Sequence, residues 1–490
     1  MKKFALILLA LVLVLAAVLG IRTLGYRSIQ IAESPAPRIE IPAAAAERLA
    51  ASLQFETISY EKEQTDLFNP APFLAFQEFL VRSFPLVHSK LSLEKVNRFG
   101  LLYRWQGSRA DLKPILLLAH SDVVPVAPES LARWTHPPFG GVIADGFIWG
   151  RGALDDKHSL MGILESIELL LAEGAVPERS VYLAFGQDEE VLGESGAAAM
   201  AALFKSEGRR FEFILDEGLP VMQEGFPGLS RPVALIGISE KGYASLELIV
   251  RSVGGHSSMP ERQTAAGLLA RAVARLEEHP FPAGIVGPVR DMFRAVGPEM
   301  SWTRKVVFAN LWLFGKVVTK MLAGSPPSNA LIRTTTAPTV LRAGIKDNVL
   351  PTEALAIVNF RILPGESVSG VVERAKSTVA DERVTVTLQE GATEPSPISS
   401  IDTDAFRMVR KAAAQIFADA LTAPGLMVGA TDSRHYVGLS PAIFRFDPVR
   451  MASADLDRPH GTNERISIEG YKDMIRFYRR LILLMTVKPS

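Results

Sequence analysis

The chain has 490 residues, too many for one ordinary domain, and its 48% hydrophobic and 22% charged residues are typical of folded globular proteins. The 53 basic residues balance the 53 acidic ones, and no basic block or RNA-binding aromatic motif occurs, so we expect no nucleic-acid partner. The absence of cysteine excludes disulfides, thiol nucleophiles and cysteine-ligated zinc.

Residues 1–27 have the pattern of a membrane anchor or signal segment. Lys2 and Lys3 precede an uncharged apolar stretch at 4–21, which as a helix would span about 27 Å, close to the ~30 Å core of a bilayer. The lysines favour a cytoplasmic N-terminus, which places the rest of the chain outside the cytoplasm. We favour an uncleaved anchor; the alternative is a cleaved signal peptide and a secreted or periplasmic protein. The proline-containing stretch at 28–42 is expected to be a linker.

Helices and strands alternate from residue 43 to residue 238. The expected helices lie at 43–53, 70–84 and 160–171, and the expected strands at 101–105, 114–119, 181–185 and 211–215. The unbroken apolar run at 114–119 is typical of a strand covered on both faces, as in a parallel sheet. This alternation favours an α/β architecture.

A second pattern occupies residues 239–391. Strands are expected at 246–250, 335–341, 354–363 and 383–388, with helices at 264–278 and 368–379. The order β-α-β-β-α-β is that of a ferredoxin-like unit, so we expect an inserted domain. The α/β pattern resumes at 392–490 with a helix at 403–418, a strand at 442–446 and a helix at 468–485.

An apolar insert at 283–330 fits neither pattern. Its part from Trp302 to Leu322 is rich in aromatic and aliphatic residues, but the lysines among them argue against a second membrane span. Two interpretations remain open. The segment is either a helix packed on the inserted domain or at a subunit interface, or an apolar surface that contacts lipid or an acyl-chain substrate.

A histidine and several carboxylates follow the ends of predicted strands or open a predicted helix. They are His120, Asp122, Asp155, Glu189, Glu190 and Asp216. Each alone has an ordinary structural interpretation, such as a solvated loop or a helix N-cap. Strand ends at one edge of a sheet lie close together, however, and carboxylates gathered there repel one another unless cations neutralise them. Imidazole and carboxylate ligands suit zinc, or less specifically manganese or cobalt.

Short motifs along the chain carry a more specific signal. They are AHSDVVPV at 119–126, WTHPPFGG at 134–141, GRGALDDKHSLMG at 150–162, FGQDEEVLGESGA at 185–197, GGHSSMP at 254–260, DNVLPTEA at 347–354, TDSRHY at 431–436 and HGTNERIS at 460–467. With these motifs the chain resembles the zinc-dependent aminoacylase/carboxypeptidase family, most closely its carboxypeptidase S and N-fatty-acyl-amino-acid hydrolase branch. The resemblance covers nearly everything from about residue 50 to residue 485.

The resemblance implies a fold and a metal centre. The fold would be a zinc-exopeptidase-like catalytic domain with a central mixed sheet, built from 43–238 and 392–490, with a ferredoxin-like lid or dimerisation domain at 239–391. Two Zn²⁺ ions per subunit would be held, with Co²⁺ or Mn²⁺ as substitutes. Their ligands would be His120 and Asp216 at one ion, Glu190 and His460 at the other, and Asp155 as the bridge. Asp122 would orient its histidine.

The resemblance also implies roles for residues around the metals. Glu189 would act as general base and then general acid. His256, in the inserted domain, would polarise the scissile carbonyl, often across a dimer in the family, so a homodimer through the lid domain is a candidate assembly. Asn348 and Arg361 would bind the carboxylate end of the substrate, with a further contribution from Arg434. The long 283–330 insert leaves the action of His256 across a dimer open.

We therefore expect a di-zinc hydrolase that cleaves an amide or peptide bond next to a free carboxylate. Metal-bound hydroxide would attack, with Glu189 as base, and the substrates would be N-acyl amino acids, including fatty-acyl ones, or short peptides. The alternative is a non-catalytic binding protein that kept the fold, although all five ligand residues and Glu189 are present. No Gly-x-Ser-x-Gly or His-Glu-x-x-His motif occurs, which disfavours a serine hydrolase or a zincin. We do not expect His158 to be a ligand.

Overall fold

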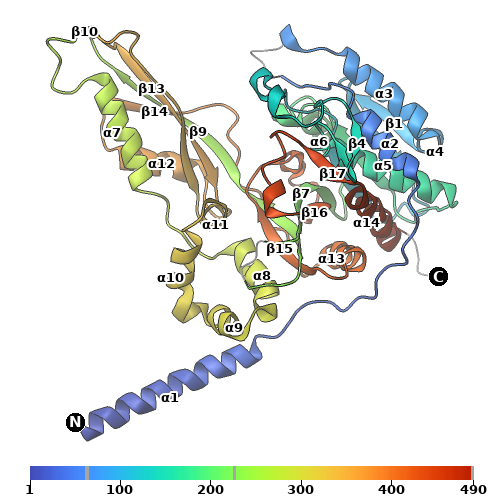
Figure 1. Cartoon of the computed structure of the whole chain (residues 1–490), viewed down its shortest axis with the longest axis horizontal. Helices are drawn as coiled ribbons and strands as arrows, with labels where there is room; N and C mark the ends of the chain where they lie inside the picture. The colour runs from blue at the N-terminus through green and yellow to red at the C-terminus, as the bar shows by residue number, and fades with distance from the viewer. Residues whose placement is uncertain (61–65, 225–227, 487–490) are drawn as a thin grey trace.

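The computed structural model describes residues 1–60, 66–224 and 228–486 (Figure 1). A large body contains the central sheet, and a smaller body with its own sheet stands beside it. The N-terminal helix α1 (Lys2–Gly25) extends away from both bodies. This helix is long and apolar enough to cross a membrane, as judged by its length and composition.

The large body is built on a mixed sheet that has eight strands within the described residues. The strands are β1 (Ser92–Val96), β2 (Gly100–Trp105), β3 (Ile115–His120), β6 (Val181–Gly186), β7 (Ile214–Met222), β8 (Val233–Glu240), β15 (Leu421–Met427) and β16 (Ile443–Met451). Their order in the sheet is β1-β2-β6-β3-β7-β16-β8-β15. Strand β3 is buried throughout and pairs in parallel with β6 and β7. Strand β2 pairs antiparallel with its neighbours, and β8 pairs antiparallel with β16 and β7 but in parallel with β15. The predicted α/β class with a mixed central sheet is confirmed.

Helices cover both faces of this sheet. Successive β3 side chains point to opposite faces, and all of them are buried, so each face packs against its own core. Leu117 packs into the core formed with α2 (Ala43–Ser52), α5 (Lys157–Ala172), α13 (Asp404–Ile416) and α14 (Ile468–Thr486). Leu116 and Leu118 pack into a separate core with α6 (Ala197–Ser206). Helices α3 (Ala71–Ser83) and α4 (Pro85–Lys90) complete this body near β1. The histidine at the end of β3 is therefore carried by a strand that cannot shift without disturbing two cores.

The small body contains an antiparallel sheet ordered β11-β13-β9-β14 in the described part of the chain. Its strands are β9 (Gly242–Arg251), β11 (Thr335–Ala343), β13 (Glu353–Ile362) and β14 (Val384–Leu388), and α7 (Ala265–Glu278) and α12 (Val368–Val379) cover one face. Elements and strand order are those of a ferredoxin-like unit. The large sheet ends with β8 at Glu240, and the small sheet begins with β9 at Gly242. The domain boundaries given above stay predictions.

Two small sheets are present, one at the tip of the small body and one on the large body. Strands β10 (Gly255–His256) and β12 (Val349–Leu350) pair at the tip of the small body, far from the central sheet (Figure 1). On the large body, β4 (Val142–Ala144), β5 (Phe147–Trp149) and β17 (Arg465–Ser467) form a short antiparallel sheet. Strand β5 precedes the predicted 150–157 loop and β17 follows the predicted 460 loop, so this sheet brings the two motifs together.

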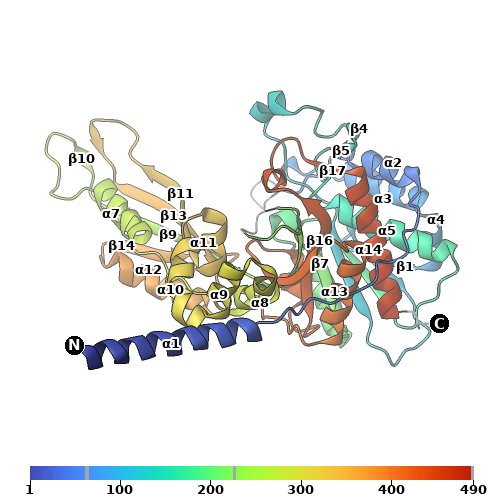
Figure 2. The ribbon, with the colours of Figure 1, turned by 60° about the horizontal axis from the view of Figure 1, so that its bottom comes forward.

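The apolar insert folds into four helices: α8 (Gly287–Val296), α9 (Trp302–Ala309), α10 (Leu311–Leu322) and α11 (Pro326–Ile332). The stretch at 302–322 is thus two helices that meet at Asn310. Helix α8 packs on the edge strand β15 of the large sheet, in a core that includes Phe293 and Leu421. Helix α9 lies against the end of α1, and α10 packs on α9 (Figures 1 and 2).

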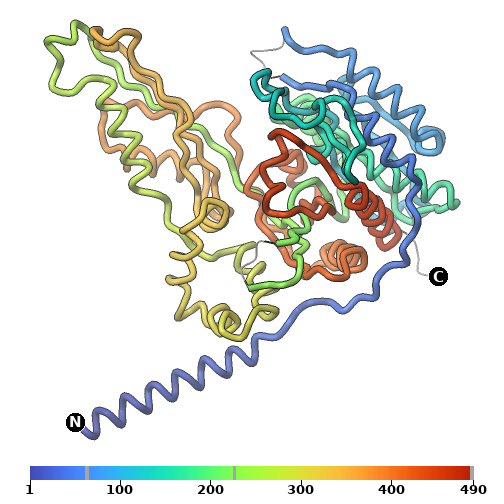
Figure 3. Tube along the Cα trace, in the orientation of Figure 1, coloured from blue at the N-terminus to red at the C-terminus, as the bar shows by residue number. Residues whose placement is uncertain are grey.

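The predicted linker at 28–42 is extended and runs along the large body from α1 to α2 (Figure 3). The Gln30 side chain donates hydrogen bonds to the carbonyl oxygens of Ala295 and Thr422, at 3.0 and 3.1 Å. The backbone N–H of Ala36 donates to the carbonyl of Gln415 at 3.0 Å. The linker is therefore docked on the large body along part of its length.

Several elements differ from the sequence-based expectation. Strand β7 continues to Met222, so Asp216 lies inside a strand and not beyond its end. The strand continues because β16, which is distant in sequence, pairs with it as far as Met222, and the nearby β8 pairs with its last two residues. Strand β15 was not predicted, because its sequence contains Pro424 and Gly425; the edge position tolerates a proline.

Replacing Leu117 by alanine should lower the free energy of unfolding by about 2–5 kcal/mol, because it removes a fully buried side chain from the central strand. Guanidinium unfolding of the purified chain in detergent, followed by tryptophan fluorescence, measures this. Leu131, which is 49% exposed, gives the matched control Leu131→Ala, with an expected change below about 0.5 kcal/mol. Equal losses for the two variants would contradict the placement of β3 in the core.

Candidate metal centre

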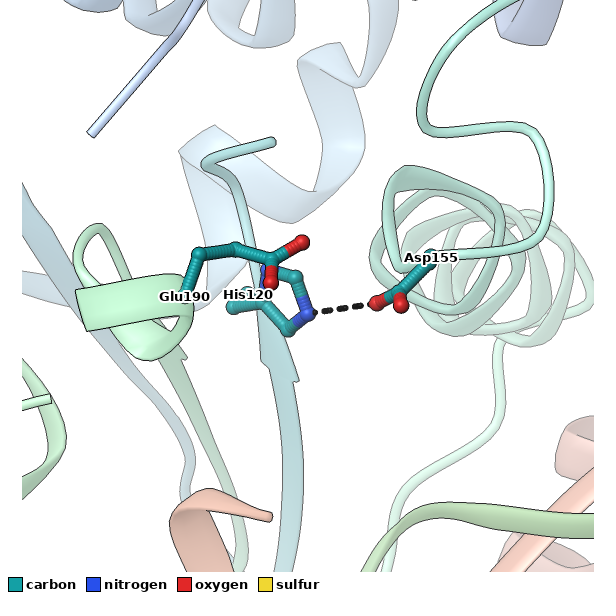
Figure 4. Close-up of side chains that lie close together, drawn as sticks. All are labelled: His120, Asp155 and Glu190. Carbon is teal, nitrogen blue, oxygen red and sulfur yellow. Dashed lines mark hydrogen bonds and ion pairs between the residues drawn. The ribbon is translucent and has the colours of Figure 1, made fainter. Parts of the chain in front are cut away.

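One aspartate carboxylate lies between two histidines that are far apart in the sequence. Asp155 Oδ1 is 3.0 Å from Nε2 of His120, and Asp155 Oδ2 is 3.0 Å from Nε2 of His460. Glu190 Oε2 also lies 3.0 Å from Nε2 of His460. Figure 4 shows His120, Asp155 and Glu190 gathered from β3, the loop before α5 and the turn after β6. The structure thus brings together four of the five residues predicted to be metal ligands.

Asp122 fixes the orientation of His120. Nδ1 of His120 lies 3.2 Å from Asp122 Oδ1 and 3.1 Å from the Asp122 carbonyl oxygen. The fully buried carboxylate also accepts hydrogen bonds from the Ser59 hydroxyl at 2.6 Å and from the backbone N–H groups of Glu189 and Glu190, both at 3.2 Å. Because Asp122 engages Nδ1, Nε2 is directed at Asp155. The same carboxylate links this histidine to the segment that carries both glutamates.

The cluster carries more buried negative charge than its histidines can balance. Burial raises the pKa of Glu190, and the negative charge of Asp155 raises it further. Burial raises the pKa of Asp156 to about 7. Hydrogen bonds to Asp155 and Glu190 raise the pKa of His460 to about 10. Within the described residues, Glu190 Oε1 is buried without a hydrogen-bond partner.

This donor set fits divalent cations. Two groups of side chains have ligand atoms within 4.8 Å of one another: His120, Asp155 and Glu190, and His120, Asp156 and Glu217. Imidazole nitrogens and carboxylate oxygens together are typical zinc ligands, and a buried surplus of carboxylates is stabilised by cations. The unpartnered Glu190 oxygen is the kind of atom that a cation would satisfy.

The structure places Asp216 away from the histidines and Glu217 near them. Asp216 Oδ2 accepts a hydrogen bond from the backbone N–H of Ser433 at 2.7 Å, and Oδ1 accepts one from the N–H of Glu217 at 3.0 Å. Glu217 Oε1 instead lies 3.6 Å from Nε2 of His120. Adjacent side chains in a strand point to opposite faces, so only one of the pair in β7 can face the cluster. Glu217 is thus the acid of this pair that lies within 4 Å of His120, and the assignment of Asp216 as a zinc ligand stays a prediction.

Glu189 lies beside the cluster and close to Arg434. Its Oε1 is 3.6 Å from Nη1 of Arg434. Burial raises the pKa of Glu189 well above its usual value, and the neighbouring Asp432 raises it further. Within the described residues, Glu189 belongs to neither of the candidate ligand groups. A raised pKa suits a group that must both accept and donate a proton.

Asp432 is a buried acid of this region that sequence reasoning did not assign. Burial raises its pKa well above the usual range. Two glycines make room for it: a Cβ on Gly193 would lie 2.3 Å from Asp432 Oδ1, and one on Gly186 would lie 2.7 Å from Oδ2. Its presence in the TDSRHY motif was the available signal, although nothing in the sequence indicated its proximity to Glu189.

A buried ion pair ties the two ligand-bearing loops together. Arg151 Nη1 lies 2.6 Å from Glu464 Oε2, and Nη2 donates to the carbonyl oxygens of His460 and Gly461, both at 3.1 Å. Glu464 Oε1 accepts from the N–H of Leu154 at 2.7 Å. Arg151 therefore connects the loop that carries Asp155 with the loop that carries His460. Sequence reasoning missed this pair, although both residues lie in the motifs GRGALDD and HGTNERIS.

The predicted substrate-binding residues fall in two places. His256 and Asn348 are both exposed at the tip of the small body, where the His256 Nδ1 lies 2.7 Å from the Ser258 hydroxyl. One chain does not bring them to the metal centre (Figure 1). Arg361 lies on β13 with its Cζ 4.9 Å from the centre of the Tyr243 ring. Burial lowers the pKa of Arg361, and the charge of Arg434 contributes, so these two guanidinium groups are within electrostatic range.

His158 packs behind the cluster. Its Nε2 lies 3.1 Å from Asp447 Oδ1, and its Nδ1 lies 3.5 Å from Asp156 Oδ1. The side chain is buried at the start of α5 and belongs to neither candidate ligand group in the described residues.

Comparison with solved structures shows a shared fold. An M20 family metallo-carboxypeptidase from Sulfolobus solfataricus gives a TM-score of 0.65 at 19% identity, covering 91% of this chain and 99% of that one. Human carnosine dipeptidase 1 gives 0.62 at 14% identity, covering 90% and 96%.

Sequence comparison shows the family. Probable carboxypeptidase S-like 2 of Dictyostelium discoideum is 46% identical over 89% of this chain and 84% of its own length. Human N-fatty-acyl-amino acid synthase/hydrolase PM20D1 is 39% identical over 89% and 86%. The family model described as Peptidase family M20/M25/M40 matches residues 116–484. Together with the histidine–carboxylate cluster, these matches show that the chain belongs to Peptidase family M20/M25/M40 and is a metallopeptidase or amidohydrolase.

Proposed function

We propose that the chain hydrolyses the amide bond of N-acyl amino acids, with two zinc ions held on either side of Asp155. The observation that carries this proposal is the shared carboxylate, whose two oxygens each face a different histidine at 3.0 Å. His120 and Glu217 would hold one ion, Glu190 and His460 the other, and cobalt or manganese could replace zinc. When bound, such ions supply Lewis-acid chemistry and lower the pKa of water.

The protein's own residues supply the proton transfer. Glu189 takes a proton from the attacking water and returns it to the leaving amine, a role that its burial and raised pKa support. Arg434, 3.6 Å from Glu189, holds this carboxylate in place and adds positive charge beside the reacting groups. Asp122 acts through His120 and the backbone of the glutamate segment, so it positions the site without contacting the substrate.

Arg361 is the proposed partner of the substrate carboxylate. In the described part of the chain, no acidic side chain forms an ion pair with Arg361, whose guanidinium lies over Tyr243. Burying an unpaired guanidinium is costly, and a planar carboxylate ligand would compensate it with two hydrogen bonds. A free carboxylate next to the cleaved bond is common to N-acyl amino acids and to short peptides. The names of the PM20D1 relatives favour fatty-acyl amino acids, and peptides are the second candidate.

A second copy of the chain is proposed to complete the site. His256 is exposed at the tip of the small body and has its Nδ1 engaged by Ser258, which leaves Nε2 free to reach a carbonyl oxygen. Since one chain keeps this tip away from its own metal centre, a homodimer through the small body would let His256 and Asn348 act in the partner's site. We further propose that α1 stays uncleaved as a membrane anchor, with the catalytic body outside the cytoplasm.

Replacing Glu189 by glutamine should lower kcat for N-acyl amino acids by about 100-fold or more, since the proton acceptor is lost while the shape is kept. A panel of N-fatty-acyl amino acids, their C-terminal amides and dipeptides, assayed with added zinc by mass spectrometry, measures this. The free acids should be cleaved much faster than the amides. Unchanged kcat in Glu189→Gln, or no cleavage by the native chain, would refute the proposed function.

Glu217→Gln should lower the bound zinc from about two ions to about one per chain, because a carboxamide is a poor zinc ligand. Elemental analysis of the purified chain gives the metal content. Asp216→Asn is the matched control on the other face of β7 and should retain both ions. Loss of zinc from the Asp216 variant, but not from the Glu217 variant, would show that Asp216 and not Glu217 binds the ion at His120.

A mixed dimer of Glu189→Gln and His256→Ala chains, isolated with two different affinity tags, should recover about half of the native activity. Each homodimer is expected to be inactive, whereas the mixed dimer has one site with both residues intact. Activity assays on the three purified dimers measure the effect. Inactivity of the mixed dimer would place His256 outside the partner's site.

A further inference from the structure

Helix α10 presents one exposed face that is both apolar and basic. This face, called here the α10 face, consists of Trp312, Leu313, Lys316, Val317, Lys320 and Met321. The spacing of these residues places all six on one side of the helix. Trp312 is 56% exposed and Val317 is 67% exposed, whereas Val318 on the opposite side is buried. An exposed face of this composition is unusual on a protein surface and indicates a binding partner.

The charge around this face has one sign. Residues 302–322 contain Arg304, Lys305, Lys316 and Lys320 and no acidic residue. A lysine can place its aliphatic stem among apolar side chains while its ammonium group stays with polar groups. Aromatic, aliphatic and lysine side chains on one helix face are typical of helices that lie in a membrane interface and contact anionic lipids.

The α10 face begins at the level where the apolar part of α1 ends. The side-chain amide of Asn310 donates to the carbonyl of Leu19 at 3.4 Å and to the hydroxyl of Thr23 at 3.3 Å. The indole N–H of Trp312 donates to the Asn310 side-chain oxygen at 3.2 Å. Arg22 is the first charged residue after Lys3, so a bilayer crossed by α1 would end near it. Trp312 therefore sits at the depth where tryptophan is enriched in membrane proteins.

We propose that the α10 face docks on the surface of the same bilayer that α1 crosses, with its lysines on anionic phospholipid headgroups. The inference goes beyond the proposed activity and depends only on α1 remaining in the bilayer. Helix α9 contacts α1, and α10 packs on α9 (Figure 2), so α10 is held near the end of α1. Trp302, 57% exposed at the start of α9, extends the contact.

A second copy of the chain is a poorer fit for this face. In a symmetric dimer the same residues would meet each other, so Lys316 and Lys320 of both copies would be brought together. No acidic residue within 302–322 could compensate them. Anionic headgroups provide the compensating charge, and the acyl chains accept the exposed side chains of Leu313, Val317 and Met321.

The test uses the full chain in lipid nanodiscs and reads tryptophan fluorescence. Helix α1 contains no tryptophan, so the five tryptophans of the chain report on the folded bodies alone. Discs of phosphatidylglycerol and phosphatidylcholine are prepared with ordinary or with brominated acyl chains, since bromine quenches only nearby indoles. We expect lower fluorescence in the brominated discs. The double variant Trp302→Phe with Trp312→Phe should lose most of that difference, and Trp134→Phe on the large body should retain it.

Lys316→Glu combined with Lys320→Glu should reduce the quenching in discs that contain phosphatidylglycerol more than in discs of phosphatidylcholine alone. Equal fluorescence of the native chain in both kinds of disc, with the chain co-eluting with the discs, would overturn the inference. Equal fluorescence is also the result expected if a second copy of the chain covers the α10 face and keeps it from the lipid. A chain that does not co-elute with discs also overturns it, because α1 is then not in the bilayer. Neither result depends on amide hydrolysis. The hydrolysis assay therefore tests the proposed function independently of this fluorescence test.

Discussion

The metal centre depends on a single carboxylate that two distant segments must reach together. His120 ends a strand buried in two cores, whereas His460 lies on a loop with φ of 59°. Asp155 can face both only if the second loop is fixed as firmly as the strand. The Arg151–Glu464 pair does this, since it bonds to both loops. Removing one partner of such a buried pair typically costs about 3–5 kcal/mol, because the other charge stays buried.

The Arg151–Glu464 ion pair does not balance the negative charge of the buried carboxylates, and a cation would do so. Burial raises the pKa values of Asp156, Glu189, Glu190 and Glu217, and repulsion among the carboxylates contributes to several of these shifts. Raised pKa values mean that the ionised carboxylates are disfavoured in the protein alone. A bound cation would stabilise their ionised form. Buried carboxylates therefore repel one another at the ends of β3 and β6, and metal binding would reduce this repulsion. Binding and structural order are coupled in this way.

The sequence allowed a prediction of candidate ligands from motifs and strand ends, but it does not indicate which of two adjacent acids faces the cluster. His120 ends the apolar strand β3, Asp122 follows two residues later, and Glu190 lies four residues after β6, so their shared edge of the sheet could be foreseen. Asp216 and Glu217 are neighbours of the same chemistry, and which one faces the cluster depends on the pairing of β7 with β16. That pairing joins segments more than 200 residues apart, a relation that local periodicity does not contain.

The sequence pattern also does not indicate what the 302–322 segment packs against. Composition identified 302–322 as an apolar segment with lysines but left its partner open, because a buried helix and an interfacial helix share that pattern. Its place is decided by α8, which packs on β15, and by Asn310, which bonds to α1.

The insert therefore joins three parts of the molecule. It contacts α1, the edge strand β15 of the large sheet and, through the carbonyl oxygen of Ala330, the Lys241 side chain at the junction with the small body. An anchor attached only through a flexible linker would let the catalytic body tumble above the membrane. If α1 is the proposed anchor, its contact with the insert would instead fix the orientation of this body. A substrate that enters from the bilayer would then meet the site from one constant direction, which matters most for amino acids that carry a long acyl chain.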